Sequence, residues 1–164
     1  MGVARFVRMV FENRATHESG SERRGLLPHD VGALTGFRIL VVDDNEETRR
    51  LLSIVLEQAG AIAIARDSVP AAMKVFEEEA PPELVITDIQ LLQLDGYELI
   101  DAIRTLPAEC GGEVPAIAVS GDTDVHTRKK VERSGFDLFL PKPVEPAELL
   151  TAARAVLGSS AAGG

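Results

Sequence analysis

Residues 37–50 read FRILVVDDNEETRR, and this stretch decides the fold. The aliphatic run from Ile39 to Val42 predicts a buried strand, which ends directly on two adjacent carboxylates, Asp43 and Asp44. Two like charges about 4 Å apart repel each other by roughly 4 kcal/mol at an effective dielectric constant of about 20. A sequence that keeps both carboxylates at the end of a buried strand therefore indicates that a cation binds there.

From residue 37 onward, short aliphatic runs alternate with longer stretches of helical period, a pattern typical of a parallel sheet covered by helices. The predicted strands span residues 38–42, 61–65, 83–87, 114–119 and 137–140. The predicted helices span residues 45–60, 68–80, 96–105, 123–133 and 145–157. Because parallel crossovers are right-handed, helices should cover both faces of the sheet. The predicted fold class is α/β, a doubly wound sheet of five parallel strands.

The helix after the first strand should begin at Asn45, a good capping residue, and end at Gly60. Its apolar residues recur at spacings of three and four, which predicts a stripe that faces the sheet. The residues of this stripe are Leu51, Leu52, Val55 and Leu56.

Length, charge and cysteine content limit the classes of function. A chain of 164 residues suits one domain with a short appendage, and its net charge of −9 argues against nucleic acid and anionic membranes as partners. No apolar stretch approaches the ~18 residues that span a bilayer, and no targeting segment is evident. The only cysteine, Cys110, excludes an internal disulfide. We therefore expect a cytoplasmic protein.

Residues 1–36 differ from the rest in composition and are expected to form an N-terminal extension. Apolar residues in this part lie at helical spacing, which fits one short amphipathic helix; they are Val3, Phe6, Val7, Val10 and Phe11. Residues 15–36 read as linker, and a flexible leader and a partner-binding helix both stay open. With residues 159–164 expected to be a disordered tail, the folded domain should span residues 37–158.

Polar side chains end or follow several predicted strands. Asp43 and Asp44 follow the first strand, Asp88 the third, Ser120 the fourth and Lys142 the fifth. Taken singly, each has an ordinary explanation as a turn former, a helix cap or a solvated charge. Because the carboxyl ends of parallel strands share one edge, where ligands bind, we expect these groups to meet in one place.

The predicted cluster contains only oxygen ligands, which specifies a hard cation. Mg²⁺ fits, since it takes few carboxylates, keeps several waters and accepts phosphate as a further ligand. Such an ion would offset the repulsion between the carboxylates, and it would bring a phosphoryl group to Asp88.

Four motifs give the chain a family resemblance: VVDD, ITDIQLLQLDGYEL, AIAVSGD and LFLPKPV, in this order. Residues 37–157 resemble the receiver domain of two-component response regulators. The resemblance implies a CheY-like, flavodoxin-like fold of five βα units. It also implies a phosphoacceptor signalling domain rather than an enzyme.

The resemblance implies a role for each site residue. Asp88 corresponds to the phosphoacceptor, which takes the phosphoryl group from a phosphohistidine of a sensor histidine kinase or a histidine phosphotransfer protein. Asp43 and Asp44 correspond to the Mg²⁺ carboxylates, with the backbone carbonyl of Gln90 as a further ligand. Lys142 corresponds to the lysine that pairs first with Asp88 and then with the phosphoryl oxygens.

Ser120 and Phe139 correspond to the family's switch residues. A phosphoryl group adds negative charge and acceptor oxygens, toward which Ser120 should turn, and Phe139 should rotate into the space that this opens. The surface of the fourth helix, fifth strand and fifth helix should then change and bind a downstream protein target. The basic residues between 126 and 133 either contribute to that surface or form an ordinary solvated helix face. Homodimerisation stays open.

The chain departs from the family pattern in the loop after Asp88. Leu91 and Leu92 stand where the family usually has Met-Pro, so we expect a less rigid loop. Phe139 replaces the commoner tyrosine. Gln90 and Asp122 occupy positions that tune dephosphorylation in the family.

Two other readings are less consistent with the sequence, and a third stays open. An aspartyl phosphatase of the haloacid dehalogenase type needs a second acid two residues after its nucleophile, where this chain has Asn45. A nucleotide-binding or flavin-binding fold needs a glycine-rich or hydroxyl-rich loop after the first strand, and NEETRR is neither. A receiver fragment of a hybrid histidine kinase stays open. We expect a stand-alone receiver without a DNA-binding output domain.

Overall fold

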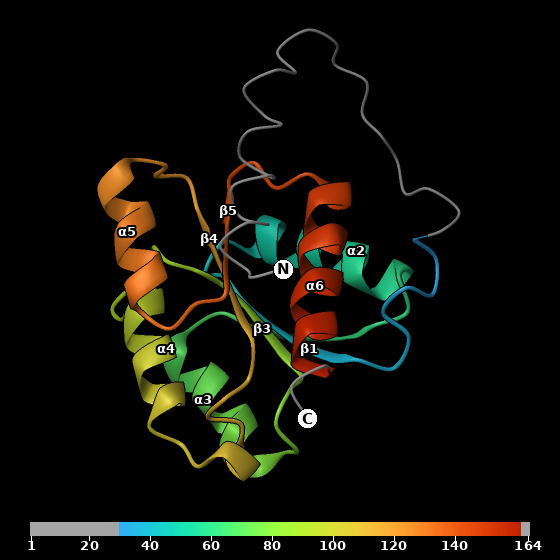
Figure 1. Ribbon diagram of the computed structural model, residues 1–164, viewed down its shortest axis with the longest axis horizontal. Helices are drawn as coiled ribbons and strands as arrows, with labels where there is room; N and C mark the ends of the chain where they lie inside the picture. Colours follow the sequence, from blue (N-terminus) through green and yellow to red (C-terminus); the bar gives the residue numbers. More distant parts are fainter. Residues whose placement is uncertain (1–29, 162–164) are drawn as a thin grey trace, which may run out of the picture.

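The computed structural model describes residues 30–161 of the chain (Figure 1). The short helix predicted near residues 3–11 lies outside them. The labels of helices and strands are those of Figure 1.

The core of the fold is one parallel five-stranded sheet with the strand order β2-β1-β3-β4-β5. Its strands are β1 (Arg38–Val42), β2 (Ile62–Arg66), β3 (Leu84–Asp88), β4 (Ala116–Ser120) and β5 (Leu138–Pro141). The prediction of five parallel strands is confirmed, with β1 at its predicted bounds and the others displaced by one or two residues toward the C-terminus. The displacement matters at β3 and β4, because Asp88 and Ser120 are paired in the ladder and thus held by the sheet.

Five helices alternate with the strands, as predicted. They are α2 (Glu46–Gln58), α3 (Val69–Glu78), α4 (Gly96–Arg104), α5 (Val125–Arg133) and α6 (Pro146–Ala161), and a short 3-10 helix, η1 (Ala108–Cys110), was not predicted. Asn45 caps α2 as expected, since its side chain accepts a hydrogen bond from the Thr48 N–H. None of the helices within residues 30–161 has the length and hydrophobicity that crossing a bilayer requires.

The helices cover both faces of the sheet, with α2 and α6 on one side and α3, α4 and α5 on the other (Figure 1). Alternate residues of β1 show this directly. Ile39 and Val41 belong to the apolar cluster under α2 and α6, whereas Leu40 and Val42 belong to the cluster under α3, α4 and α5. The doubly wound α/β fold is therefore confirmed, because both faces of the sheet are buried.

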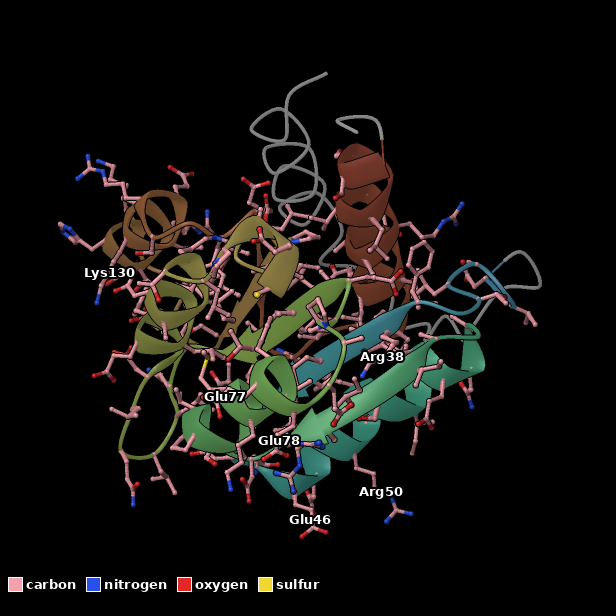
Figure 2. The ribbon with its side chains drawn as sticks, turned by 90° about the horizontal axis from the view of Figure 1, so that it is seen from below. Arg38, Glu46, Arg50, Glu77, Glu78 and Lys130 are labelled. Carbon is pink, nitrogen blue, oxygen red and sulfur yellow. The ribbon has the colours of Figure 1, made fainter. Side chains whose placement is uncertain are left out.

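The stripe predicted on α2 is wrong at one residue. Leu52, Val55 and Leu56 are buried against the sheet, but Leu51 is 53% exposed. With 3.6 residues per turn, Leu51 lies on the flank of a face centred on the other three, so it turns away from the sheet. Figure 2 shows Glu46 and Arg50 of the same helix projecting outward.

Residues 30–36 pack onto the domain, although the sequence analysis assigned them to a linker. The Leu34 side chain is 1% exposed, and its N–H donates to the Ala59 carbonyl at 2.9 Å. The Gly36 N–H donates to the Gly60 carbonyl at 3.1 Å. At the other end of the chain, α6 continues to Ala161, beyond the expected boundary at residue 158. The packed part of the chain thus begins before the expected bound at residue 37, and helical structure continues past residue 158.

Leu34→Ala is expected to lower the free energy of unfolding by about 2–4 kcal/mol, the usual cost of truncating a buried leucine. The nearby Val31 side chain is 69% exposed. Val31→Ala is the matched control and should change stability by no more than about 0.5 kcal/mol. Urea denaturation of both variants measures the difference. Equal stability of the two variants would show that residues 30–36 do not belong to the cooperative core.

Candidate functional site

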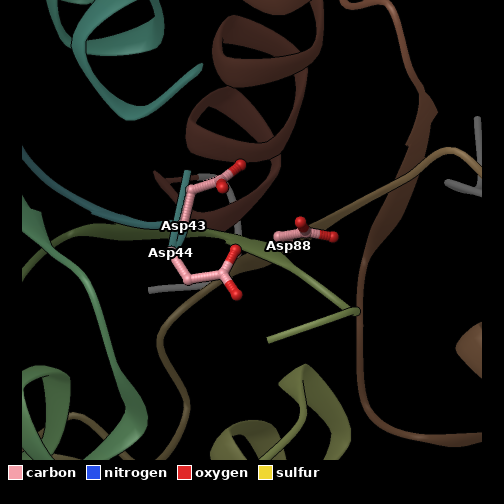
Figure 3. A group of neighbouring side chains, drawn as sticks. All are labelled: Asp43, Asp44 and Asp88. Atoms are coloured by element: carbon pink, nitrogen blue, oxygen red, sulfur yellow. The ribbon is translucent and has the colours of Figure 1, made fainter. Parts of the chain in front are cut away.

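Three carboxylates gather at the carboxyl edge of the sheet. Asp43 and Asp44 follow β1, and Asp88 ends β3. Each offers an oxygen within 4.8 Å of the other two. Figure 3 shows the three side chains meeting in one space. The structure thus brings together the carboxylates whose convergence the sequence predicts.

Burial sets the electrostatics of this cluster. Asp43 is 1% exposed and Asp88 is 6% exposed. Burial raises the pKa of the Asp43 carboxyl above its ordinary value, and the Asp88 charge acts in the same direction. The hydrogen bond from the Asn45 N–H and the charge of Lys142 oppose the increase without cancelling it. Asp43 is therefore a carboxylate that another positive charge would stabilise.

Lys142 supplies one positive charge to the cluster. Its Nζ donates to Asp88 Oδ2 at 2.7 Å and to Asp43 Oδ2 at 3.2 Å. Burial alone would lower the pKa of Lys142. The hydrogen bonds to Asp88 and Asp43 and the negative charges of these two residues outweigh the effect of burial, so the pKa of Lys142 is raised. Three ionised carboxylates and one ammonium leave two negative charges uncompensated.

Backbone N–H groups fix one oxygen of each carboxylate. The Asn45 N–H donates to Asp43 Oδ1 at 2.9 Å. The Gln90 N–H donates to Asp88 Oδ1 at 3.0 Å, and the Leu92 N–H donates to Asp44 Oδ2 at 3.0 Å. The carboxylates are therefore oriented before any ligand binds. Gln90 lies beside the cluster as expected, while the role of its carbonyl stays a prediction.

Ser120 and Phe139 lie on the neighbouring strands. Ser120 ends β4 and is 1% exposed, and its Oγ accepts a hydrogen bond from the Asp122 N–H at 3.1 Å. Phe139 is paired with Ala118, two residues before Ser120, and is 4% exposed in the cluster under α3, α4 and α5. Its ring is thus packed in the interior. The backbone N–H of Lys142 donates to the Ser120 carbonyl at 2.9 Å, which joins the ends of β4 and β5.

Two further residues support the site, and one of them, Arg49, was not predicted. Arg49 on α2 donates from Nη1 to the Asp43 carbonyl at 2.7 Å, and its position one turn after the cap Asn45 was the available signal. Gly96 opens α4 directly behind the end of β3, where an added Cβ would lie 2.5 Å from the Asp88 carbonyl oxygen. Only a residue without a side chain fits there, so Gly96 sets how closely α4 approaches Asp88.

The donor set fits a magnesium ion. Its side-chain ligands are all carboxylate oxygens, and the uncompensated charge of the cluster equals that of one divalent cation. A hard, small cation of this kind prefers carboxylates, waters and phosphate oxygens to nitrogen or sulfur ligands. Asp43, Asp44 and Asp88 are the residues that could hold it.

Comparison with known proteins gives one consistent result. Residues 39–154 match the model of the response regulator receiver domain. The chain is 41% identical over 117 residues to an uncharacterized 14.6 kDa protein from the sodA1 3′ region of Leptolyngbya boryana, a match that covers 71% of this chain and 87% of that protein. It is 33% identical to the sensor histidine kinase GacS of Pseudomonas protegens over 74% of this chain, but spans only 13% of that kinase.

Among solved structures, a CheY-like response regulator receiver domain protein from Methanospirillum hungatei JF-1 superimposes with a TM-score of 0.71 at 25% identity. The superposition covers 79% of this chain and 100% of the other. The fold, the carboxylate cluster and the match over residues 39–154 lead to one conclusion: the chain belongs to the response regulator receiver domain family.

Proposed function

We propose that Asp88 accepts a phosphoryl group from a phosphohistidine and that the phosphorylated domain signals to another protein. The contact between Lys142 Nζ and Asp88 Oδ2, 2.7 Å long and set within a cluster of three carboxylates, carries the proposal. An ammonium at this distance orients the carboxylate and reduces its repulsion against an incoming phosphoryl group.

In the proposed reaction, a carboxylate oxygen of Asp88 forms a bond to phosphorus while the bond between phosphorus and the histidine nitrogen breaks. The electron pair of the broken bond stays on the imidazole, and the product is an aspartyl phosphate. Positioning and electrostatics dominate such a transfer, so the site needs no general base of its own. Each domain takes up one group, and the proposed role is that of an acceptor rather than a turnover enzyme.

Asp43, Asp44 and Asp88 would hold Mg²⁺, with the Gln90 carbonyl as a further ligand. When bound, the ion supplies positive charge to the phosphoryl oxygens. The raised pKa of Lys142 keeps its ammonium charged at neutral pH, so the same side chain that pairs with Asp88 and Asp43 is available to pair with a phosphoryl oxygen.

Two kinds of partner are proposed: a protein that donates the phosphoryl group and a protein that binds the phosphorylated domain. A sensor histidine kinase or a histidine phosphotransfer protein would donate the phosphoryl group; GacS, a sensor histidine kinase, contains a segment similar to this chain. A downstream protein would bind the face formed by α5, β5 and α6. The exchange is assigned to the cytoplasm, because the single cysteine, Cys110, is a free and exposed thiol of the kind that persists in reducing compartments.

Incubation of the full chain with Mg²⁺ and acetyl phosphate, followed by intact mass measurement, tests this function. We expect a single added phosphoryl group, which hydroxylamine removes as it does other acyl phosphates, and no addition when a chelator has removed the metal. A matched incubation with a phosphorylated histidine phosphotransfer protein should give the same product. Failure of both donors in the presence of Mg²⁺ would refute the proposed function.

The competing function is phosphatase activity toward small esters. It predicts continued release of phosphate from a substrate such as p-nitrophenyl phosphate, with no lasting mass increase of the protein. The receiver function predicts the reverse pattern, since Asp88 keeps the group it has accepted until the acyl phosphate hydrolyses. Phosphate release in step with ester consumption would favour the phosphatase.

A further inference from the structure

Asp122 connects the buried hydroxyl of Ser120 to the first turn of α5. Its backbone N–H donates to Ser120 Oγ at 3.1 Å. Its carboxylate reaches in the other direction, where Oδ2 accepts a hydrogen bond from the Thr127 hydroxyl at 3.0 Å and Oδ1 accepts one from the Asp124 N–H at 3.2 Å. One residue therefore holds both the end of β4 and the beginning of α5.

Capping of α5 does not explain the contact between Asp122 and Thr127. The N-cap of α5 is Asp124, whose Oδ1 accepts the Thr127 N–H at 2.6 Å. The helix start thus already has the side-chain acceptor that a cap provides. The second carboxylate, from Asp122, adds a link from the helix back to the segment that follows β4, where the Asp122 N–H contacts Ser120.

We propose that Asp122 is a positioning residue that transmits the phosphorylation state of Asp88 from Ser120 to α5 through the Thr127 hydroxyl. This inference rests on the proposed function. When the Ser120 hydroxyl turns to donate its hydrogen to a phosphoryl oxygen, its Oγ moves away from the Asp122 N–H. An N–H that loses its acceptor costs free energy until the backbone moves to find another.

The movement of the Asp122 backbone carries its carboxylate, and Thr127 follows because its hydroxyl is bonded to that carboxylate. The first turn of α5 therefore changes position in response to Ser120. A second contact, Lys130 Nζ at 3.8 Å from the Tyr97 ring centre, holds the middle of α5 against α4, so the change is concentrated at the helix start.

The test follows the amide NMR signals of α5 in the full chain with Mg²⁺, before and after phosphorylation by excess acetyl phosphate. Thr127→Val removes the hydroxyl while keeping the shape of the side chain, and Asp122→Ala removes the carboxylate. The shift of the α5 signals on phosphorylation should become about two- to threefold smaller in each variant, as expected when one hydrogen bond is lost. The double variant should show no further decrease relative to Asp122→Ala, because the bond that Thr127→Val removes is already broken when the Asp122 carboxylate is absent.

Two further variants separate transmission from simple loss of helix stability. Thr127→Ser keeps the hydroxyl and should restore the wild-type response. Thr151→Val removes a comparable hydroxyl from α6, where Thr151 bonds the Ala147 carbonyl at 2.7 Å, and should leave the α5 response unchanged. Intact mass should show the same phosphoryl uptake in Thr127→Val as in the wild type.

The outcomes are distinguishable. A wild-type response of α5 in Thr127→Val, or additive losses in the double variant, overturns the role of Asp122 while the proposed function stands. Absence of phosphoryl uptake by the wild type overturns both. Uptake with a reduced α5 response, restored by Thr127→Ser, supports the inference.

Discussion

Asp88→Asn is expected to reduce phosphoryl uptake from acetyl phosphate to background. The substituted amide has nearly the shape of the carboxylate, and its one oxygen is able to accept the hydrogen bond from either Lys142 Nζ or the Gln90 N–H, which Asp88 accepts on different oxygens. It lacks the anionic oxygen that forms the bond to phosphorus. Intact mass after incubation with Mg²⁺ measures the loss, which therefore reports chemistry rather than collapse of the site.

Asp101→Asn is the matched control for this substitution. Asp101 is an exposed carboxylate on α4, outside the cluster at the carboxyl edge of the sheet. The control should take up the phosphoryl group as the wild type does. If Asp88→Asn still gains the group to the same extent, the acceptor is another residue, and peptide mapping should then be directed first at Asp43 and Asp44, the other two carboxylates of the cluster.

The parts of the fold that depend on local pattern were predictable from the sequence. All four residues at positions 39–42 are aliphatic, so a strand formed by them is apolar on both faces. Such a pattern is typical of a strand buried between two layers of helices. The convergence of Asp43, Asp88 and Lys142 then follows from topology, because parallel strands bring their carboxyl ends to one edge. The sequence determines these features through rules that need no knowledge of packing.

Features that depend on packing between distant segments were not predictable. Leu34 is buried only because the turn at residues 30–36 meets the end of α2, whereas the high content of Gly, Ser, Glu and Arg in residues 15–36 suggested a linker. Leu51 fits a helical stripe as well as Leu52 does, and the direction of the helix axis over the sheet decides which of them is buried.

The backbone conformation of the loop after Asp88 was also not predictable from the sequence. Gln93 adopts a positive φ of 71°, and Leu92 is 76% exposed although its N–H bonds Asp44. Sequence motifs placed these residues near Asp88 but did not give the direction of their backbone hydrogen bonds. Those bonds orient the carboxylates, so the geometry of the site comes partly from backbone that carries no sequence signal of its own.

Asp43→Asn is expected to stabilise the domain without Mg²⁺ and to destabilise it relative to the wild type with Mg²⁺. Without metal, the substitution removes a carboxylate that is 1% exposed and close to two others, and the free energy of unfolding should rise by about 1–2 kcal/mol. With Mg²⁺ at roughly 100 times its dissociation constant, the wild type should gain about 2.7 kcal/mol that the variant lacks. Urea denaturation with a chelator and with Mg²⁺ measures this reversal.

Lowering the pH should reduce the advantage of Asp43→Asn in the absence of metal. The pKa of Asp43 in the folded protein is raised above its ordinary value of 3.8, chiefly by burial, so the folded state binds this proton more tightly than the unfolded chain does. The resulting stabilisation of the wild type is complete below 3.8 and is lost as the pH rises through the raised value. The variant has no such proton, so the difference between the two proteins should be largest at neutral pH and shrink toward pH 4.

Two results would contradict this interpretation of the cluster. If Asp43→Asn is less stable than the wild type in chelator, the ion pair between Lys142 and Asp43, 3.2 Å long, contributes more than the burial and repulsion of the carboxylate cost. If Mg²⁺ stabilises the variant as much as the wild type, Asp43 is not a metal ligand. Asp101→Asn should behave as the wild type in both buffers, because its exposed carboxylate lies outside the cluster. If neither result is found, binding of a cation explains why two adjacent acids follow β1, since Asp43 would then destabilise the empty site and contribute to its affinity for Mg²⁺.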